Sequence, residues 1–171
     1  MSFSEDLIWH AISLLPDIEH QEYRNDVSLR RAVSASYYAL FHNINSKAVE
    51  LIAPNVPAET NYRIQRWFEH AEMKRICGRF LPAKLDQPLR DLIGETASVD
   101  LQNVARSFIQ LQDARHRADY DLSYDLTWEQ ARQYIELSVG AIGAWERISS
   151  SAEANIFILS LLLWKNWDKD R

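Results

Sequence analysis

The sequence predicts an all-α fold: an antiparallel up-and-down bundle of four to five main helices, followed by an apolar helix near the C-terminal end. The chain of 171 residues contains only 4 Gly and 5 Pro, well below the combined share of roughly 12% in an average protein, so turns are few and elements are long. Ala and Leu far outnumber Val and Thr, which favours helices over strands. No long stretch alternates apolar and polar residues, as a half-buried strand would.

Two helices are predicted in the first third of the chain. The first begins at Ser4, an N-cap residue whose two successors are acidic and suit the positive end of a helix. Pro16 ends or kinks it, and residues 17–23 are expected to continue as a second helical piece. The second main helix covers about 28–53 and ends before Pro54. Beside its apolar stripe lies a face of small residues, suited to close helix contact. These are Ala32, Ala35, Ser36 and Ala39.

Two more helices follow, separated by a loop. The sequence from 59 to 79 reads as a helix with a break near His70. Residues 81–97 contain two prolines and a glycine and are expected to form a loop with at most one short helix. Ser98 is the expected N-cap of the next helix, which runs to about Tyr120.

Two helices are predicted to complete the chain. Thr127 opens the fifth, since Gln130 lies three residues further on in the spacing of a capping box. After a short hinge, a last helix over 152–167 is apolar almost all round. We expect residues 1–150 to form the bundle, and the apolar helix at 151–171 to serve oligomerisation or to close the core.

Charge limits the partners that the chain can attract. It carries 19 Lys and Arg against 24 Asp and Glu, a net charge of −5 with neutral His. Binding to nucleic acid or to an anionic membrane through bulk charge is excluded, so any nucleic-acid contact requires a local basic face. The first ten residues lack the basic start and apolar stretch of a signal peptide, and the longest apolar run, 156–164, is about half a membrane span. We expect a cytoplasmic protein that does not enter a membrane.

Standard catalytic and metal-binding motifs do not occur in the sequence. It contains no GxGxxG, GxxxxGK, HExxH or GxSxG pattern and no EF-hand loop. The one cysteine, Cys77, excludes an internal disulfide and a Cys-based zinc cluster. The five histidines include no pair at i, i+4. We therefore expect no metal and no cofactor.

Arg115 is the first candidate site residue. It falls four residues after Leu111, on the apolar side of the predicted fourth helix, where an unpaired guanidinium is costly. Asp119, at i+4, is the obvious partner. Two interpretations stay open: a structural Arg–Asp pair that fixes the helix end, and an Arg held ready for a phosphate, to which its planar fork is suited.

Two further groups are candidates. On the second helix, Tyr38 and His42 are i, i+4 neighbours beside the apolar stripe, and both have polar tips that need partners when buried. On the predicted third helix, four basic residues at spacings of three, four and four form one stripe. This stripe is either a face for a phosphate backbone or a solvated surface. Its members are Arg63, Arg66, His70 and Lys74.

Two segments of the sequence stand out as a pair, residues 34–42 (SASYYALFH) and residues 115–121 (RHRADYD). Together they resemble the HEPN superfamily (higher eukaryotes and prokaryotes nucleotide-binding) of helical-bundle proteins. The first is similar to the second-helix signature of the bacterial members. The second is similar to the motif at the end of a later helix, in its R-x-x-A-D-Y variant. The resemblance covers about 28–148 and implies a homodimer in which the Arg motifs of two subunits face a shared cleft.

Many members of this superfamily are metal-independent ribonucleases, often toxins paired with a minimal nucleotidyltransferase antitoxin. Their active motif is an Arg, a polar residue and then a His four to six residues after the Arg. Carried over, Arg115 takes the Arg position and His116 the polar position, while the His position holds Tyr120. Cleavage of RNA without metal needs a proton donor and acceptor near neutral pH, which a His with a pKa of ~6.5 supplies and a Tyr at ~10 does not.

The sequence therefore favours a HEPN-like homodimer that binds RNA, a nucleotide or a partner protein without cleaving RNA, in a toxin–antitoxin or nucleotidyltransferase-paired system. Arg115 is the expected anion-binding or structural anchor, and Asp119 orients it. The other residues expected to line the cleft are Tyr38, His42, His116 and Tyr120. Two alternatives stay open. One is an active metal-independent ribonuclease that uses Arg115 with His116 or His42, and the other is a structural module in which the Arg–Asp pair only stabilises the bundle.

Overall fold

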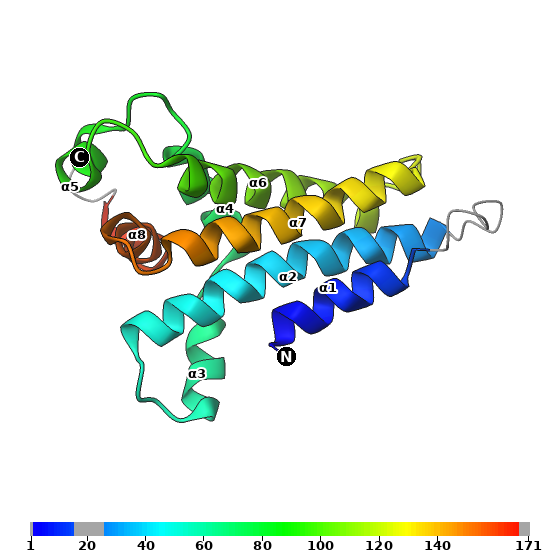
Figure 1. Ribbon diagram of the computed structural model, residues 1–171, viewed down its shortest axis with the longest axis horizontal. Helices are drawn as coiled ribbons and strands as arrows, with labels where there is room; N and C mark the ends of the chain where they lie inside the picture. Colours follow the sequence, from blue (N-terminus) through cyan, green and yellow to red (C-terminus); the bar gives the residue numbers. More distant parts are fainter. Residues whose placement is uncertain (1, 16–25, 168–171) are drawn as a thin grey trace. The chain divides into compact units, whose positions relative to one another are not determined.

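The computed structural model describes residues 2–15 and 26–167 of the chain. These residues form eight helices and no strand (Figure 1), which confirms the all-α prediction. None of the helices in this part of the chain combines the length and the apolar character needed to cross a bilayer. The helices are α1 (Phe3–Ser13), α2 (Asp26–Ile52), α3 (Ala58–Gln65), α4 (His70–Arg79), α5 (Gln87–Ile93), α6 (Val99–Tyr120), α7 (Trp128–Ile148) and α8 (Ala152–Trp167).

Helix α1 begins earlier than predicted. The Ser2 hydroxyl accepts a hydrogen bond from the Glu5 amide at 3.3 Å, and the Glu5 carboxylate accepts one from the Ser2 amide at 2.6 Å. This reciprocal pair is a capping box, and it leaves Ser4 buried inside the helix. The prediction of Ser4 as N-cap was wrong because only Ser2 has a Glu three residues further on. The predicted helical piece at 17–23 lies outside the described residues.

The predicted boundaries of the later helices are confirmed. The Gln130 amide donates to the Thr127 hydroxyl at 3.1 Å, and the Thr127 amide donates to the Gln130 side chain at 3.0 Å, which completes the capping box of α7. The Ser98 hydroxyl caps α6 by accepting a hydrogen bond from the amide three residues on, at 3.2 Å. The third predicted helix is broken near His70 into α3 and α4, and α5 is the one short helix in the predicted loop.

The chain divides into two compact units, each described by itself. Unit 1 comprises Met1–Asn43 and Ser107–Ile142. It contains α1, the first part of α2, the second part of α6 and most of α7, and these successive segments run in opposite directions (Figure 1), as in an up-and-down bundle. Helices α1, α2 and α7 meet through mostly small side chains, two of which belong to the predicted small face of α2. The cluster is Ala11, Ala32, Ala35 and Ile135.

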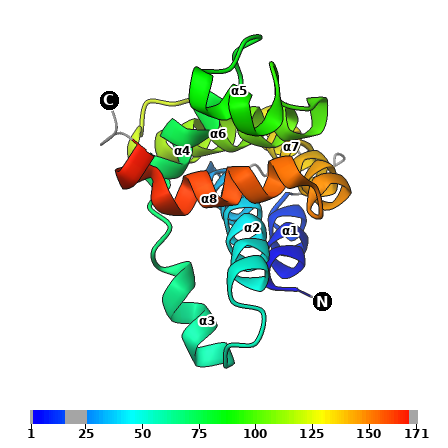
Figure 2. The same ribbon diagram turned by 90° about the vertical axis from the view of Figure 1, so that its left-hand side faces the viewer.

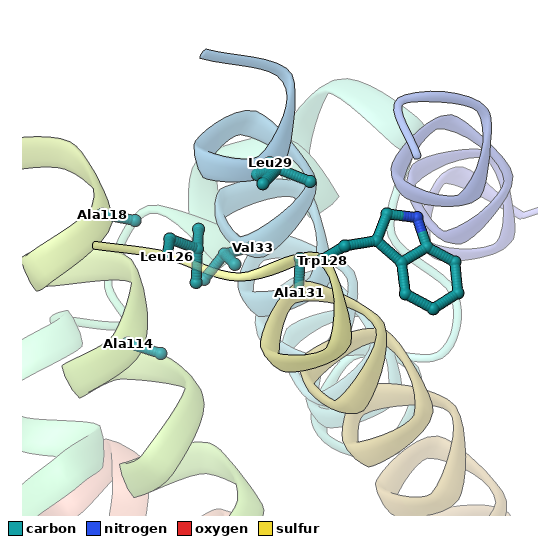
Figure 3. Packing of buried hydrophobic residues seen from close by; sticks show 7 residues of the cluster. All are labelled: Leu29, Val33, Ala114, Ala118, Leu126, Trp128 and Ala131. Atoms are coloured by element: carbon teal, nitrogen blue, oxygen red, sulfur yellow. The ribbon is translucent and has the colours of Figure 1, made fainter. Parts of the chain in front are cut away.

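A second buried cluster in unit 1 joins α2, α6 and α7 (Figure 3). Helix α6 contributes only alanines to it, so its backbone lies close to the larger side chains of α2 and of the turn before α7. Inside the same unit, the Ser138 hydroxyl of α7 donates to the carbonyl of Ser36 at 2.7 Å. This packing fixes the segments of α2 and α6 that carry the candidate site. The cluster is Leu29, Val33, Ala114, Ala118, Leu126, Trp128 and Ala131.

Unit 2 comprises Ile44–Arg106 and Gly143–Arg171. In it α8 packs on α4 and α5, and Figure 2 shows α8 running across the view with α5 above it. The Phe157 ring of α8 lies 5.1 Å from the ring of Phe80 and 5.8 Å from that of Trp145, and all three side chains are fully buried. Leu159 and Leu163 of α8 are exposed. One side of α8 is thus buried inside unit 2, and its role in oligomerisation stays a prediction.

Candidate functional site

A row of polar side chains on α2 faces the end of α6 inside unit 1. Arg30, Ser34, Tyr38 and His42 follow one another at four-residue intervals, and a helix with 3.6 residues per turn brings such positions to one side. The first three make hydrogen bonds to α6 or to the turn that follows it. Candidate residues from two distant parts of the sequence are therefore neighbours in the fold.

The Arg115 guanidinium lies at the centre of this contact. Its Nη2 donates to the Tyr38 hydroxyl at 3.1 Å, and its Nε lies 2.7 Å from Oδ2 of Asp119. The Nε–H is not directed at an acceptor, so the contact with Asp119 is an ion pair held by charge. The guanidinium carbon lies 5.5 Å from the ring centroids of both Tyr38 and Tyr120, within the range of cation–π attraction. The side chain is 24% exposed, so the guanidinium is anchored on several sides and still open to solvent.

The electrostatic surroundings keep Arg115 charged. Burial alone would lower the pKa of Arg115, but the neighbouring Tyr38, Asp119 and Tyr120 outweigh burial and raise that pKa. The guanidinium is therefore a permanent positive charge. A fixed, planar and always charged donor fork is the group that suits a phosphate or another oxyanion.

Asp119 is held by a residue that sequence reasoning missed. The Ser34 hydroxyl donates to Oδ1 of Asp119 at 2.6 Å, while Oδ2 pairs with Arg115. The two carboxylate oxygens thus contact different partners. This fixes the orientation of the carboxylate and leaves Oδ2 as the oxygen that pairs with Arg115. Ser34 stands in one of the two HEPN-like segments, but its role depends on which turn of α6 lies opposite it in the fold.

Arg30 holds the C-terminal end of α6 and was also missed. Its Nη1 donates to the carbonyls of Ala118 and Asp121, both at 2.9 Å, and its Nη2 donates to the carbonyl of Tyr124 at 2.7 Å. Its Nε donates to Asp26 at 2.6 Å. The last carbonyls of a helix lack partners within the helix, so a guanidinium there both caps the helix and complements its dipole. The ion pair with Asp26 could be predicted from the four-residue spacing in the sequence. The contacts with the three carbonyls could not, because they depend on how α2 packs against the end of α6.

The structure connects all six predicted cleft residues of unit 1, but to different degrees. Three of them contact the Arg115 guanidinium directly: Asp119, Tyr38 and Tyr120. His116 is exposed and joins them through Tyr120, with ring centroids 5.0 Å apart. His42 joins them through Tyr38, on which its ring stacks at 6.2 Å.

His42 lies in a mostly apolar environment. Its ring centroid is 5.0 Å from that of Phe3 in α1 and 5.2 Å from that of Phe41. Burial lowers the pKa of His42 from its ordinary value of 6.5. The imidazole is therefore neutral at neutral pH, and protonating it is unfavourable in the folded state.

Replacing His42 by Phe is expected to reduce the loss of stability on acidification. Because the pKa of His42 is lowered on folding, the unfolded chain takes up a proton below the ordinary value of 6.5 that the folded chain excludes. His42 thus reduces stability as the pH falls from its unfolded pKa toward its folded one, and Phe keeps a ring without this effect. Thermal unfolding at about pH 7.5 and about pH 5.5 tests this difference. An equal fall in Tm for wild type and His42→Phe would contradict it.

The predicted basic stripe does not lie on one continuous helix. Arg63 lies in α3 and Arg66 is its C-cap, whereas His70 and Lys74 lie in α4. Because the helical register is interrupted between them, the spacing of three, four and four does not by itself bring them to a common face. Arg63 also pairs with Glu59 at 3.1 Å on the surface. A role for this basic face in binding stays a prediction.

In the described part of the chain, no group of three or more His, Cys, Asp or Glu side chains is arranged to hold a metal ion. Comparisons with protein-family models, with curated proteins and with solved structures give no match to this chain. The resemblance to the HEPN superfamily therefore stays an interpretation of two sequence segments.

Proposed function

We propose that this chain is a HEPN-like RNA-binding protein that contacts an RNA phosphate through Arg115 and does not cleave the RNA. The observation that carries the proposal is the anchoring of Arg115 by Asp119 and Tyr38, with the guanidinium carbon 5.5 Å from the centres of two tyrosine rings. A guanidinium that is fixed in advance loses little side-chain entropy on binding, and its geometry suits phosphate oxygens. With a net charge of −5, affinity for RNA has to come from such a local contact.

The contact between the two HEPN-like segments supports the proposal. Residues 34–42 and 115–121 are joined by the hydrogen bonds Ser34–Asp119 and Tyr38–Arg115. The resemblance adds the expectations of a homodimer and of a nucleotidyltransferase-type partner protein in a toxin–antitoxin type of system, and the sequence itself adds that of a location in the cytoplasm.

Binding without cleavage is expected because the HEPN histidine position holds Tyr120. His42 is a poor substitute, since its ring packs among aromatic side chains. His116 follows Arg115 directly, about 100° round the helix, and its ring lies against Tyr120. Neither His42 nor His116 therefore replaces the histidine that the HEPN ribonuclease motif has at the position of Tyr120.

Replacing Arg115 by Ala is expected to weaken the binding of a labelled, mixed-sequence single-stranded RNA by about tenfold or more, because one charge-assisted contact to phosphate is lost. Fluorescence anisotropy titrations in EDTA measure the Kd. Arg132→Ala is a matched control and is expected to bind within about twofold of wild type. Arg132 also pairs with a carboxylate four residues on, Glu136, at 2.8 Å, and also lies near an aromatic ring, that of Trp128 at 5.9 Å.

Two results would contradict the proposal. If Arg115→Ala lowers the Tm but leaves the Kd unchanged, the Arg–Asp pair is structural and the chain is an interaction module. If the wild type cuts the RNA in EDTA and Arg115→Ala does not, the chain is a metal-independent ribonuclease.

A further inference from the structure

An exposed aromatic ring stands next to the anchored guanidinium. Tyr120 is the last residue of α6 and is 65% exposed. The guanidinium carbon of Arg115 lies 5.5 Å from the centre of this ring. The exposed ring of His116 lies 5.0 Å from it, inclined by 49°. Two accessible rings and a fixed cation therefore occupy one short stretch of surface.

The backbone that carries Tyr120 is held in place. Arg30 donates to the carbonyls of Ala118 and Asp121, on either side of Tyr120 along the chain. The ring itself lies within cation–π range of the Arg115 guanidinium, at 5.5 Å. An aromatic side chain ordered before binding loses little entropy when a flat ligand stacks on it.

The ligand that fits this arrangement carries a flat ring close to a phosphate. In single-stranded RNA the bases are free to stack on aromatic side chains, while the phosphates are available to Arg. In a duplex the bases are already stacked and paired, so an exposed protein ring finds no base face. The pairing of Tyr120 with Arg115 therefore favours single strands over duplexes.

We propose that Tyr120 is a base-stacking residue, so that the ligand of the Arg115 site is single-stranded RNA with an unpaired base beside the bound phosphate. This inference rests on the proposed function and names its ligand class. His116 adds a second ring edge beside the same base. Single-stranded DNA offers the same phosphate and base chemistry and serves as a second probe.

The test compares four probes in anisotropy titrations: a single-stranded RNA, the same RNA as a duplex, a single-stranded DNA of the same sequence and inorganic polyphosphate, which has no bases. Tyr120→Ala is expected to weaken binding of both single strands by about fivefold or more, the effect of losing one stacked base. Binding of polyphosphate is expected to fall by a smaller factor than binding of the single strands, and Tyr120→Phe, which keeps the ring, is expected to recover most of the single-strand affinity that Tyr120→Ala loses. Tyr62→Ala is the matched control, since Tyr62 is 67% exposed on α3.

The outcomes separate this inference from the proposed function. If Arg115→Ala weakens RNA binding but Tyr120→Ala does not, or if the wild type binds duplex as tightly as single strand, the stacking role is wrong and the phosphate contact stands. If the wild type binds none of the nucleic acids, the proposed function is wrong and the stacking role with it. If Tyr120→Ala weakens the binding of polyphosphate as much as the binding of RNA, the stacking role is wrong and Tyr120 only orients Arg115.

Discussion

Replacing Arg30 by Ala is expected to lower the free energy of unfolding by about 3 kcal/mol, because three carbonyls and one carboxylate lose a charged donor at a largely buried site. The Arg30 side chain is 11% exposed and binds the carbonyls of Ala118, Asp121 and Tyr124 together with Asp26. For a chain of this size, the Tm should fall by roughly 6–12 °C. Thermal unfolding followed by circular dichroism measures the fall.

Arg31→Ala is the control for this prediction. It removes the same charge from the adjacent position of α2, where the side chain is exposed, and should change stability by no more than about 0.5 kcal/mol. Arg30→Lys should recover only part of the loss, because an ammonium lacks the planar fork that reaches several carbonyls. Equal Tm values for Arg30→Ala and Arg31→Ala would show that Arg30 does not hold the end of α6.

Phe157→Ala is expected to have the largest effect on stability, about 3–5 kcal/mol, because it opens a cavity in the core of unit 2. The ring is fully buried between Phe80 and Trp145. The Tm should fall by roughly 6–20 °C, measured by calorimetry.

Leu159→Ala is the matched control on the same helix. Leu159 is 38% exposed, and its truncation should leave the Tm of the chain nearly unchanged.

Light scattering on the same samples tests the expected role of α8 in oligomerisation, since a contact between copies would use exposed residues such as Leu159 and Leu163. A larger fall in Tm for Leu159→Ala than for Phe157→Ala would contradict the packing of α8.

Helix boundaries could be predicted well wherever a local signal marks them. The Thr127–Gln130 box and the Ser98 cap are side chain to backbone hydrogen bonds within one turn, so their spacing in the sequence is enough. The N-cap of α1 was misplaced because acidic residues follow both Ser2 and Ser4. Only the three-residue spacing from Ser2 to Glu5, which a capping box requires, identifies Ser2 as the N-cap. The basic stripe depended on an unbroken helix, and the break between α3 and α4 interrupts it.

The site could be predicted only in part, because half of it depends on tertiary contacts. The i, i+4 rule was enough to pair Arg115 with Asp119. Ser34 and Arg30 were missed because their partners are a carboxylate and carbonyls 85 or more residues away in the sequence. A row of polar residues at four-residue spacing on a buried helix is the signal that points to such positions.

The most direct test of binding without cleavage is to analyse the same RNA samples on native and denaturing gels. Wild type and Arg115→Ala are incubated with mixed single-stranded RNA and with tRNA in EDTA. The proposed function predicts that wild type shifts single-stranded RNA on the native gel, that Arg115→Ala does not at the same concentration, and that all RNA is intact on the denaturing gel. Defined fragments with wild type and none with Arg115→Ala would contradict it and identify the chain as a ribonuclease.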